Sequence, residues 1–154
     1  MTHHEFQYQR MMRYFHRLEQ IEFGVKLGSE RRGDDCIDDI FAFFLNCYHL
    51  KDWLKNDPAF TKRTKQQVED YVKTTPCLLL CADICHATKH LMLRGTRSGS
   101  VPRFEDINLT AFEGGPLDKH VAYQLVIEHA GKKQTALAIA RECVRAWDSF
   151  LFLL

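Results

Sequence analysis

Long apolar runs are missing from this sequence. The two longest uninterrupted ones, residues 40–45 and 77–82, hold six residues each, whereas a membrane-spanning helix needs about 20. The first five residues, Met-Thr-His-His-Glu, contain no apolar stretch of the kind that marks a secretory signal. We therefore expect a protein that does not span a membrane and that is located in the cytoplasm.

An excess of charge of either sign is also missing. Lys and Arg number 21 and Asp and Glu number 20, which gives a net charge of +1. Because nucleic-acid-binding domains are usually basic, the net charge does not support a nucleic-acid partner. Hydrophobic residues make up 45% and charged residues 27% of the 154, a composition typical of one globular domain.

No C-x-x-C pair occurs, so zinc-ribbon and thioredoxin-like sites have no support in the sequence. Six cysteines are present nevertheless, and Cys77, Cys81 and Cys85 recur every four residues, on one side of the expected helix. In the cytoplasm we expect thiols rather than disulfides. The favoured interpretation is that they are small buried hydrophobes, and a metal–thiolate site is the alternative.

The spacing of apolar residues predicts a chain rich in helices. The expected helices cover residues 4–27, 36–56, 61–73, 76–93 and 135–152. Thr75-Pro76 is a typical helix start. The second helix is apolar nearly all round, which is typical of a central helix. Its main apolar face is expected to carry Ile37, Phe41, Phe44, Leu45 and Tyr48.

Alternating residues predict a strand at 121–129, the mixed segment 103–112 could form another, and Ala130-Gly131-Lys132 fits a tight hairpin turn. The expected fold is mainly α (α+β): a bundle of about four helices, a small antiparallel hairpin or sheet, and a C-terminal helix packed on the bundle. We expect a single domain over residues 1–154. Its parts are the helical bundle (1–95), a loop and β element (96–135), and the closing helix (136–154).

Polar side chains on two of these helices form the main candidate site. His49 and Asp52 are three residues apart on the second helix, and Asp83, His86 and His90 recur along the fourth. Consecutive long helices in a bundle are usually antiparallel neighbours, so the two sets could face each other. Asp52 falls in the apolar sector of its helix, where a carboxylate is costly unless it is paired or metal-bound.

Three interpretations of these five residues remain open. They could bind a divalent metal ion, as histidines and carboxylates on facing helices do. They could form an acid–base or ribonuclease-type site, with Lys89 or Arg94 as the contact to phosphate or RNA. They could also be a structural network that fixes the register of the bundle. Arg94, Arg97 and Arg103 flank a Gly/Ser loop and are either solvated charges or a phosphate contact.

Two strings in these helices resemble known motifs. Residues 49–53, His-Leu-Lys-Asp-Trp, and residues 83–90, Asp-Ile-Cys-His-Ala-Thr-Lys-His, resemble the H-L-x-D-W and D-x-x-N-x-x-K-H motifs of small, mostly uncharacterised bacterial proteins. More remotely, they resemble HEPN-like proteins. That resemblance implies a helical bundle, frequent dimers and, in some members, metal-independent RNA cleavage in toxin–antitoxin or phage-defence systems.

The sequence departs from the HEPN nuclease signature, Arg-x4–6-His. No Arg precedes His86 or His90 at that spacing, and only Arg10 and His16, on the first expected helix, fit it. The expected function is therefore that of a bacterial cytoplasmic accessory or interaction protein without catalysis, whose partner is a second copy or a small protein. A metal-dependent hydrolase or oxidase with a divalent cofactor in the His/Asp site, and an RNase toxin, are the alternatives.

Overall fold

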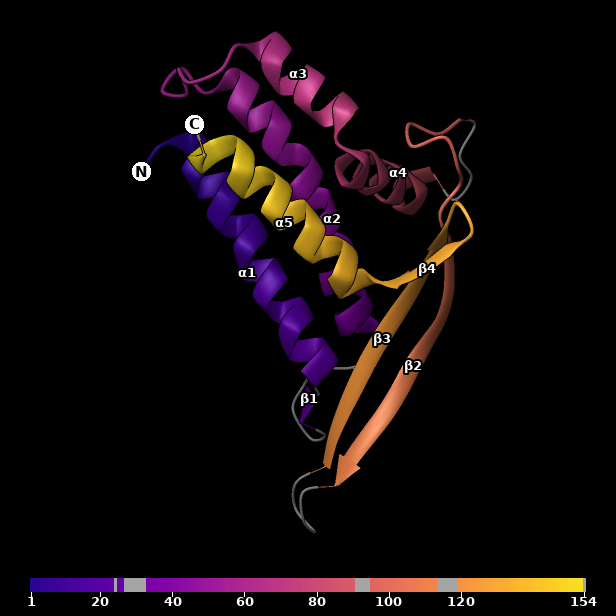
Figure 1. The fold of residues 1–154 in the computed structure, drawn as a ribbon. Coiled ribbons are helices and arrows are strands. Elements are labelled where there is room, and N and C mark those ends of the chain that lie inside the picture. The colour runs from indigo at the N-terminus through magenta and orange to yellow at the C-terminus, as the bar shows by residue number, and fades with distance from the viewer. Residues whose placement is uncertain (24, 27–32, 91–94, 114–118, 154) are drawn as a thin grey trace.

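Figure 1 shows the fold in a computed structural model, which describes residues 1–23, 25–26, 33–90, 95–113 and 119–153. These residues form the helices α1 (His3–Phe23), α2 (Gly33–Asn56), α3 (Lys65–Thr74), α4 (Pro76–His90) and α5 (Ala136–Phe152). They also form the strands β1 (Val25–Lys26), β2 (Arg103–Glu113), β3 (Lys119–His129) and β4 (Lys132–Thr135). The fold is mainly helical, with a small antiparallel sheet and a C-terminal helix packed on the other helices, as the sequence predicts.

Strand β3 is the centre of the sheet. It pairs antiparallel with β1, β2 and β4. In Figure 1 the long β2–β3 hairpin extends past one end of α1 and α2. Ala130 and Gly131 join β3 to β4 at φ values of 52° and 76°. Two successive positive φ values give a turn whose twist matches that of the strands, which confirms the expected tight turn.

Threonine side chains begin two of the helices. The Thr64 hydroxyl accepts the Gln67 backbone N–H at 3.1 Å, and the Gln67 side chain accepts the Thr64 N–H in return. This reciprocal pair starts α3 at Lys65, so the expected start at residue 61 is too early. The Thr135 hydroxyl likewise accepts the Ala138 N–H at the start of α5. Helix α4 begins at Pro76, as expected.

Helix α2 is central and packs against α1, α3, α4 and α5. Its fully buried residues include Phe43, Phe44, Cys47 and Leu50. The expected main face of α2 is wrong for Leu45, which is 37% exposed, and for Phe41 and Tyr48, which are only partly buried. Because this helix is apolar nearly all round, its pattern does not single out one face, and the neighbouring helices decide which face is buried.

Both chain ends lie at the same end of the helices, where α1 begins and α5 ends (Figure 1). Among the described residues, no helix combines the length and the apolar character that crossing a membrane requires. None of the six cysteines forms a disulfide, and all of them except Cys77 are buried.

Candidate functional site

The two α2 members of the expected His/Asp set lie at the surface. His49 is exposed. The Asp52 side chain is 48% exposed, and its carboxylate lies 3.3 Å from the Lys55 ammonium and 3.7 Å from that of Lys51. Asp52 therefore belongs to a surface ion-pair group with the α3 residue Glu69, and its expected position in the apolar sector is wrong.

Lys55 and Glu69 are the closest pair in that group. The contact with Glu69 raises the pKa of the Lys55 ammonium. The same contact lowers the pKa of the Glu69 carboxyl. Both shifts favour the charged forms, so the pair links α2 to α3 by charge.

The α4 member Asp83 is buried and tied to the loop that follows α4. Its side chain is among the few buried carboxylates, at 2% exposure. It accepts the backbone N–H of Arg97 at 2.8 Å, the backbone N–H of Ser98 at 2.9 Å, and the Ser98 hydroxyl. The Ser98 hydroxyl in turn lies 2.7 Å from Nε2 of His129, at the end of β3. Asp83 thus joins α4, the loop and the sheet, which is a structural role.

His86 has partners at both ring nitrogens. Its Nδ1 donates to the Ala82 carbonyl at 2.8 Å, so Nε2 is the acceptor for Arg97 Nη1 at 3.0 Å. The ring also meets Tyr48 edge-on, with centroids 5.5 Å apart and planes at 81°. His86 therefore links its own helix to the loop and to α2.

The expected single centre of five residues does not form among the members that the structure describes. Asp52 and Asp83 have separate partners, and no three of His49, Asp52, Asp83 and His86 come together as a metal-binding group. His90 and Lys89 end α4, but their side chains lie outside the described residues, as does Arg94. The orientation of α2 about its own axis explains why the expected centre does not form, because it directs Cys47 rather than Asp52 toward α4.

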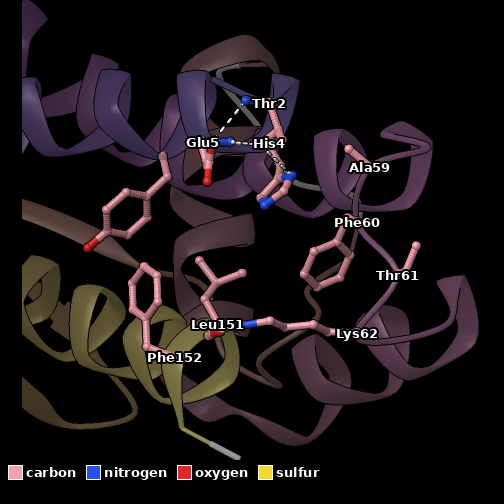
Figure 2. A pocket seen from close by; sticks show the side chains of 10 residues that line it. Thr2, His4, Glu5, Ala59, Phe60, Thr61, Lys62, Leu151 and Phe152 are labelled. Carbon is pink, nitrogen blue, oxygen red and sulfur yellow. Dashed lines mark hydrogen bonds between the residues drawn. The ribbon is translucent and has the colours of Figure 1, made fainter.

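A cavity of about 260 Å³ opens where the two chain ends meet, between the start of α1, residues 59–62 and the end of α5 (Figure 2). Phe60, Leu151 and Phe152 give it apolar walls. Its polar groups are already paired: Lys62 donates to the Leu151 carbonyl at 3.2 Å, and the His4 Nδ1 lies 2.7 Å from an Asp57 oxygen. The cavity offers an apolar shape, but no set of converging reactive groups.

A cluster of thiols lies in the core. Cys47 of α2, Cys81 of α4 and Cys143 of α5 have their Sγ atoms within 4.8 Å of one another. Each is at most 1% exposed. Of the described residues, this is the group whose spacing suits a metal ion. Cys77, one turn before Cys81, is half-buried beside it, and its carbonyl accepts the Cys143 thiol at 3.4 Å.

The side chains of this cluster shift one another's pKa values in opposite directions. Burial by itself would raise the pKa of the Cys47 thiol, but the neighbouring Cys143, Cys81 and Trp147 side chains together hold it well below its usual range. Hydrogen bonds to Cys47, Cys77 and Cys81 raise the pKa of Cys143 in turn.

Several residues of these sites carry no local sequence signal. Cys47 and Cys143 lie on separate helices far from Cys81 in sequence, so only the four-residue spacing of Cys77 and Cys81 was visible. Ser98 and His129 were likewise not expected to meet Asp83. In comparisons with known proteins, no family model, no curated protein and no solved structure matches this chain.

Proposed function

We propose that this protein is a non-catalytic interaction protein of the cytoplasm that binds an acidic segment of a protein partner. The proposed contact surface, called the Tyr48 face, consists of Tyr48, Lys51, His86 and Arg97. The observation that carries the proposal is the Arg97 side chain. It is exposed, and among the described residues no carboxylate lies within ion-pair distance of it.

The backbone beneath Arg97 is fixed. The buried Asp83 carboxylate accepts the N–H groups of Arg97 and Ser98. The guanidinium itself donates to His86 Nε2, and its Cζ lies 5.5 Å from the centre of the Tyr48 ring. A cation held in place before binding loses less conformational entropy when a partner arrives, which favours affinity.

A second cation reaches the same ring. Lys51 Nζ lies 4.8 Å from the centre of Tyr48, and its nearest carboxylates, on Asp52 and Glu69, are 3.7 and 3.6 Å away. Contacts with an aromatic ring position a cation without neutralising it. The Lys51 charge is already paired with these two carboxylates, so Arg97 is the cation of this face that is open to an incoming carboxylate, which it can bind in bidentate fashion.

The hydrogen bonds of His86 and Asp83 support the proposed absence of catalysis. A general base needs a free lone pair in reach of its substrate. Both nitrogens of His86 have partners within the protein, and the Asp83 carboxylate is held by three donors. The lack of disulfides among the six cysteines supports the cytoplasmic location, because that compartment keeps thiols reduced.

The test is a binding titration with a short fluorescent oligo-glutamate peptide, followed by anisotropy at low salt. We expect Arg97→Gln to weaken binding about tenfold or more, since charge-assisted hydrogen bonds contribute about 1.5–3 kcal/mol. Arg141→Gln is the matched control, because Arg141 is an exposed arginine on α5. Equal binding by the two variants, or no binding by wild type, would refute the proposal.

A parallel titration with single-stranded RNA separates this proposal from the RNase alternative. We expect weaker binding of RNA than of the peptide and no cleavage. Tighter binding of RNA would overturn the proposed class of partner. Cleavage that is lost in His86→Ala would overturn the proposed absence of catalysis.

A further inference from the structure

We propose that Cys47, Cys81 and Cys143 bind one zinc ion, with Cys77 as the fourth ligand. This site is separate from the Tyr48 face and does not depend on the function proposed for that face. Its ligands come from three helices, α2, α4 and α5. The ion would therefore join the central helix α2 to α4 and α5.

The spacing of the sulfurs suits a single ion. Zn–S bonds of about 2.3 Å in a tetrahedral site place neighbouring sulfurs about 3.8 Å apart. The three Sγ atoms already lie within 4.8 Å of one another. Because these two separations differ by only about 1 Å, small side-chain movements would bring the sulfurs to the tetrahedral geometry.

We assign Cys77 as the fourth ligand, although its sulfur lies outside the close group of three and has to move toward them. It lies one helical turn before Cys81, so the two thiols share one side of α4. The Cys77 carbonyl accepts the Cys143 thiol at 3.4 Å, so the start of α4 lies directly beside Cys143. Cys77 is half-buried, whereas the other three are fully buried. It therefore provides both the fourth sulfur and the side from which an ion can enter.

A buried indole points to charge on the cluster. Trp147, one turn after Cys143 on α5, is 1% exposed. Its Nε1 has no hydrogen-bond acceptor among the described residues, and the sulfur of Cys47 is close to it. A buried N–H without a partner is costly. A metal-bound thiolate at Cys47 would give it a strong acceptor, as outer-sphere donors do at metal sites.

The chemistry of the ligand set favours zinc. Thiolates prefer soft or borderline ions, and four of them in a tetrahedron form a closed structural zinc site with no open position for water. On binding, each thiol releases its proton to solvent and its sulfur donates an electron pair to the ion, with no change in oxidation state. The ion would stabilise the fold rather than catalyse a reaction.

The first test is the metal content of protein purified without chelator. We expect about one zinc per chain in wild type and none in Cys143→Ala. The matched control is Cys85→Ala, which removes a buried thiol one turn beyond Cys81 on the same helix and should keep the zinc. Zinc retained in Cys143→Ala would refute the site.

A cobalt titration of metal-free, reduced wild-type protein keeps the proposal testable if Cys143→Ala does not fold. We expect the absorption of tetrahedral cobalt–thiolate coordination, saturating at one equivalent and lost when zinc is added. No such absorption would overturn the site, as would a Cys143 disulfide in protein purified without reductant.

The role of Cys77 has its own readout. Because this thiol is partly exposed, alkylation followed by mass spectrometry reports its protection directly. Zinc should slow its alkylation, and Cys77→Ser should weaken cobalt binding by about tenfold or more. Unchanged alkylation and affinity would remove Cys77 from the ligand set.

Discussion

Asp83 and Ser98 are joined twice, although they are 15 residues apart in the sequence. The Ser98 backbone N–H lies 2.9 Å from an Asp83 carboxylate oxygen, and the Ser98 hydroxyl donates to the same atom. The first bond fixes the main chain of the loop, and the second orients a side chain that also meets His129. One buried carboxylate on α4 thus sets the position of the segment that carries Arg97.

Removal of this carboxylate should destabilise the protein. We expect Asp83→Ala to lower the free energy of unfolding by about 2–3 kcal/mol, because it leaves two backbone donors and a hydroxyl without their acceptor. The control is Asp52→Ala, whose half-exposed carboxylate forms surface ion pairs and should contribute about 0–1 kcal/mol. Urea unfolding of both variants measures the difference, and equal losses would contradict the assigned role of Asp83.

The contact between His4, at the start of α1, and Asp57 should make the free energy of unfolding depend on pH in the acid range. His4 donates its backbone N–H to Asp57 at 2.8 Å, and its ring Nδ1 lies 2.7 Å from the same oxygen. The backbone N–H of His4 is the main cause that lowers the pKa of Asp57 to about 2, from an ordinary 3.8, and the N–H of Ala59 adds to it.

Because this pKa is lower in the folded state, the ionised Asp57 adds stability above the unfolded value of 3.8, and this stability is lost as the pH falls toward about 2. We expect wild type to be more stable than Asp57→Asn at pH 6, and this difference to shrink as the pH falls through that window. Unfolding in urea at several pH values measures it. A difference that stays constant with pH would show that Asp57 does not titrate in this way.

The turn between β3 and β4 should require glycine at residue 131. Gly131 has φ of 76°, and a Cβ placed there would meet no atom within 4 Å. We therefore expect Gly131→Ala to cost about 1–2 kcal/mol through backbone strain alone. Gly95→Ala is the control, since Gly95 is equally open and does not have a positive φ. Thermal unfolding should show a lower Tm for the first variant and little change for the second.

The cap of α3 gives a further prediction. Thr64→Ala removes the hydroxyl that accepts the Gln67 N–H and should lower the free energy of unfolding by about 1 kcal/mol. Thr61→Ala changes an exposed threonine before the helix and should have little effect. The two variants are compared by urea unfolding, and a Thr61→Ala loss as large as that of Thr64→Ala would rule out the cap as the cause.

The positions of the helices could largely be predicted from local signals. Thr75-Pro76 began α4 as expected, and the alternation before Ala130-Gly131 predicted β3 and its turn. The buried face of α2 could not be predicted, because apolar residues surround that helix. For the same reason the prediction that Asp52 lies among core residues is wrong, and its carboxylate lies beside Lys55 at the surface.

The sequence by itself determined where helices and strands form, because caps, turns and apolar spacing act over a few residues. Tertiary structure decided which side chains meet. Packing against four helices turned Cys47 inward, toward Cys81 and Cys143, and left His49 at the surface. These contacts join residues that are far apart in the chain, and they depend on the summed burial of whole helix faces, to which no short motif corresponds.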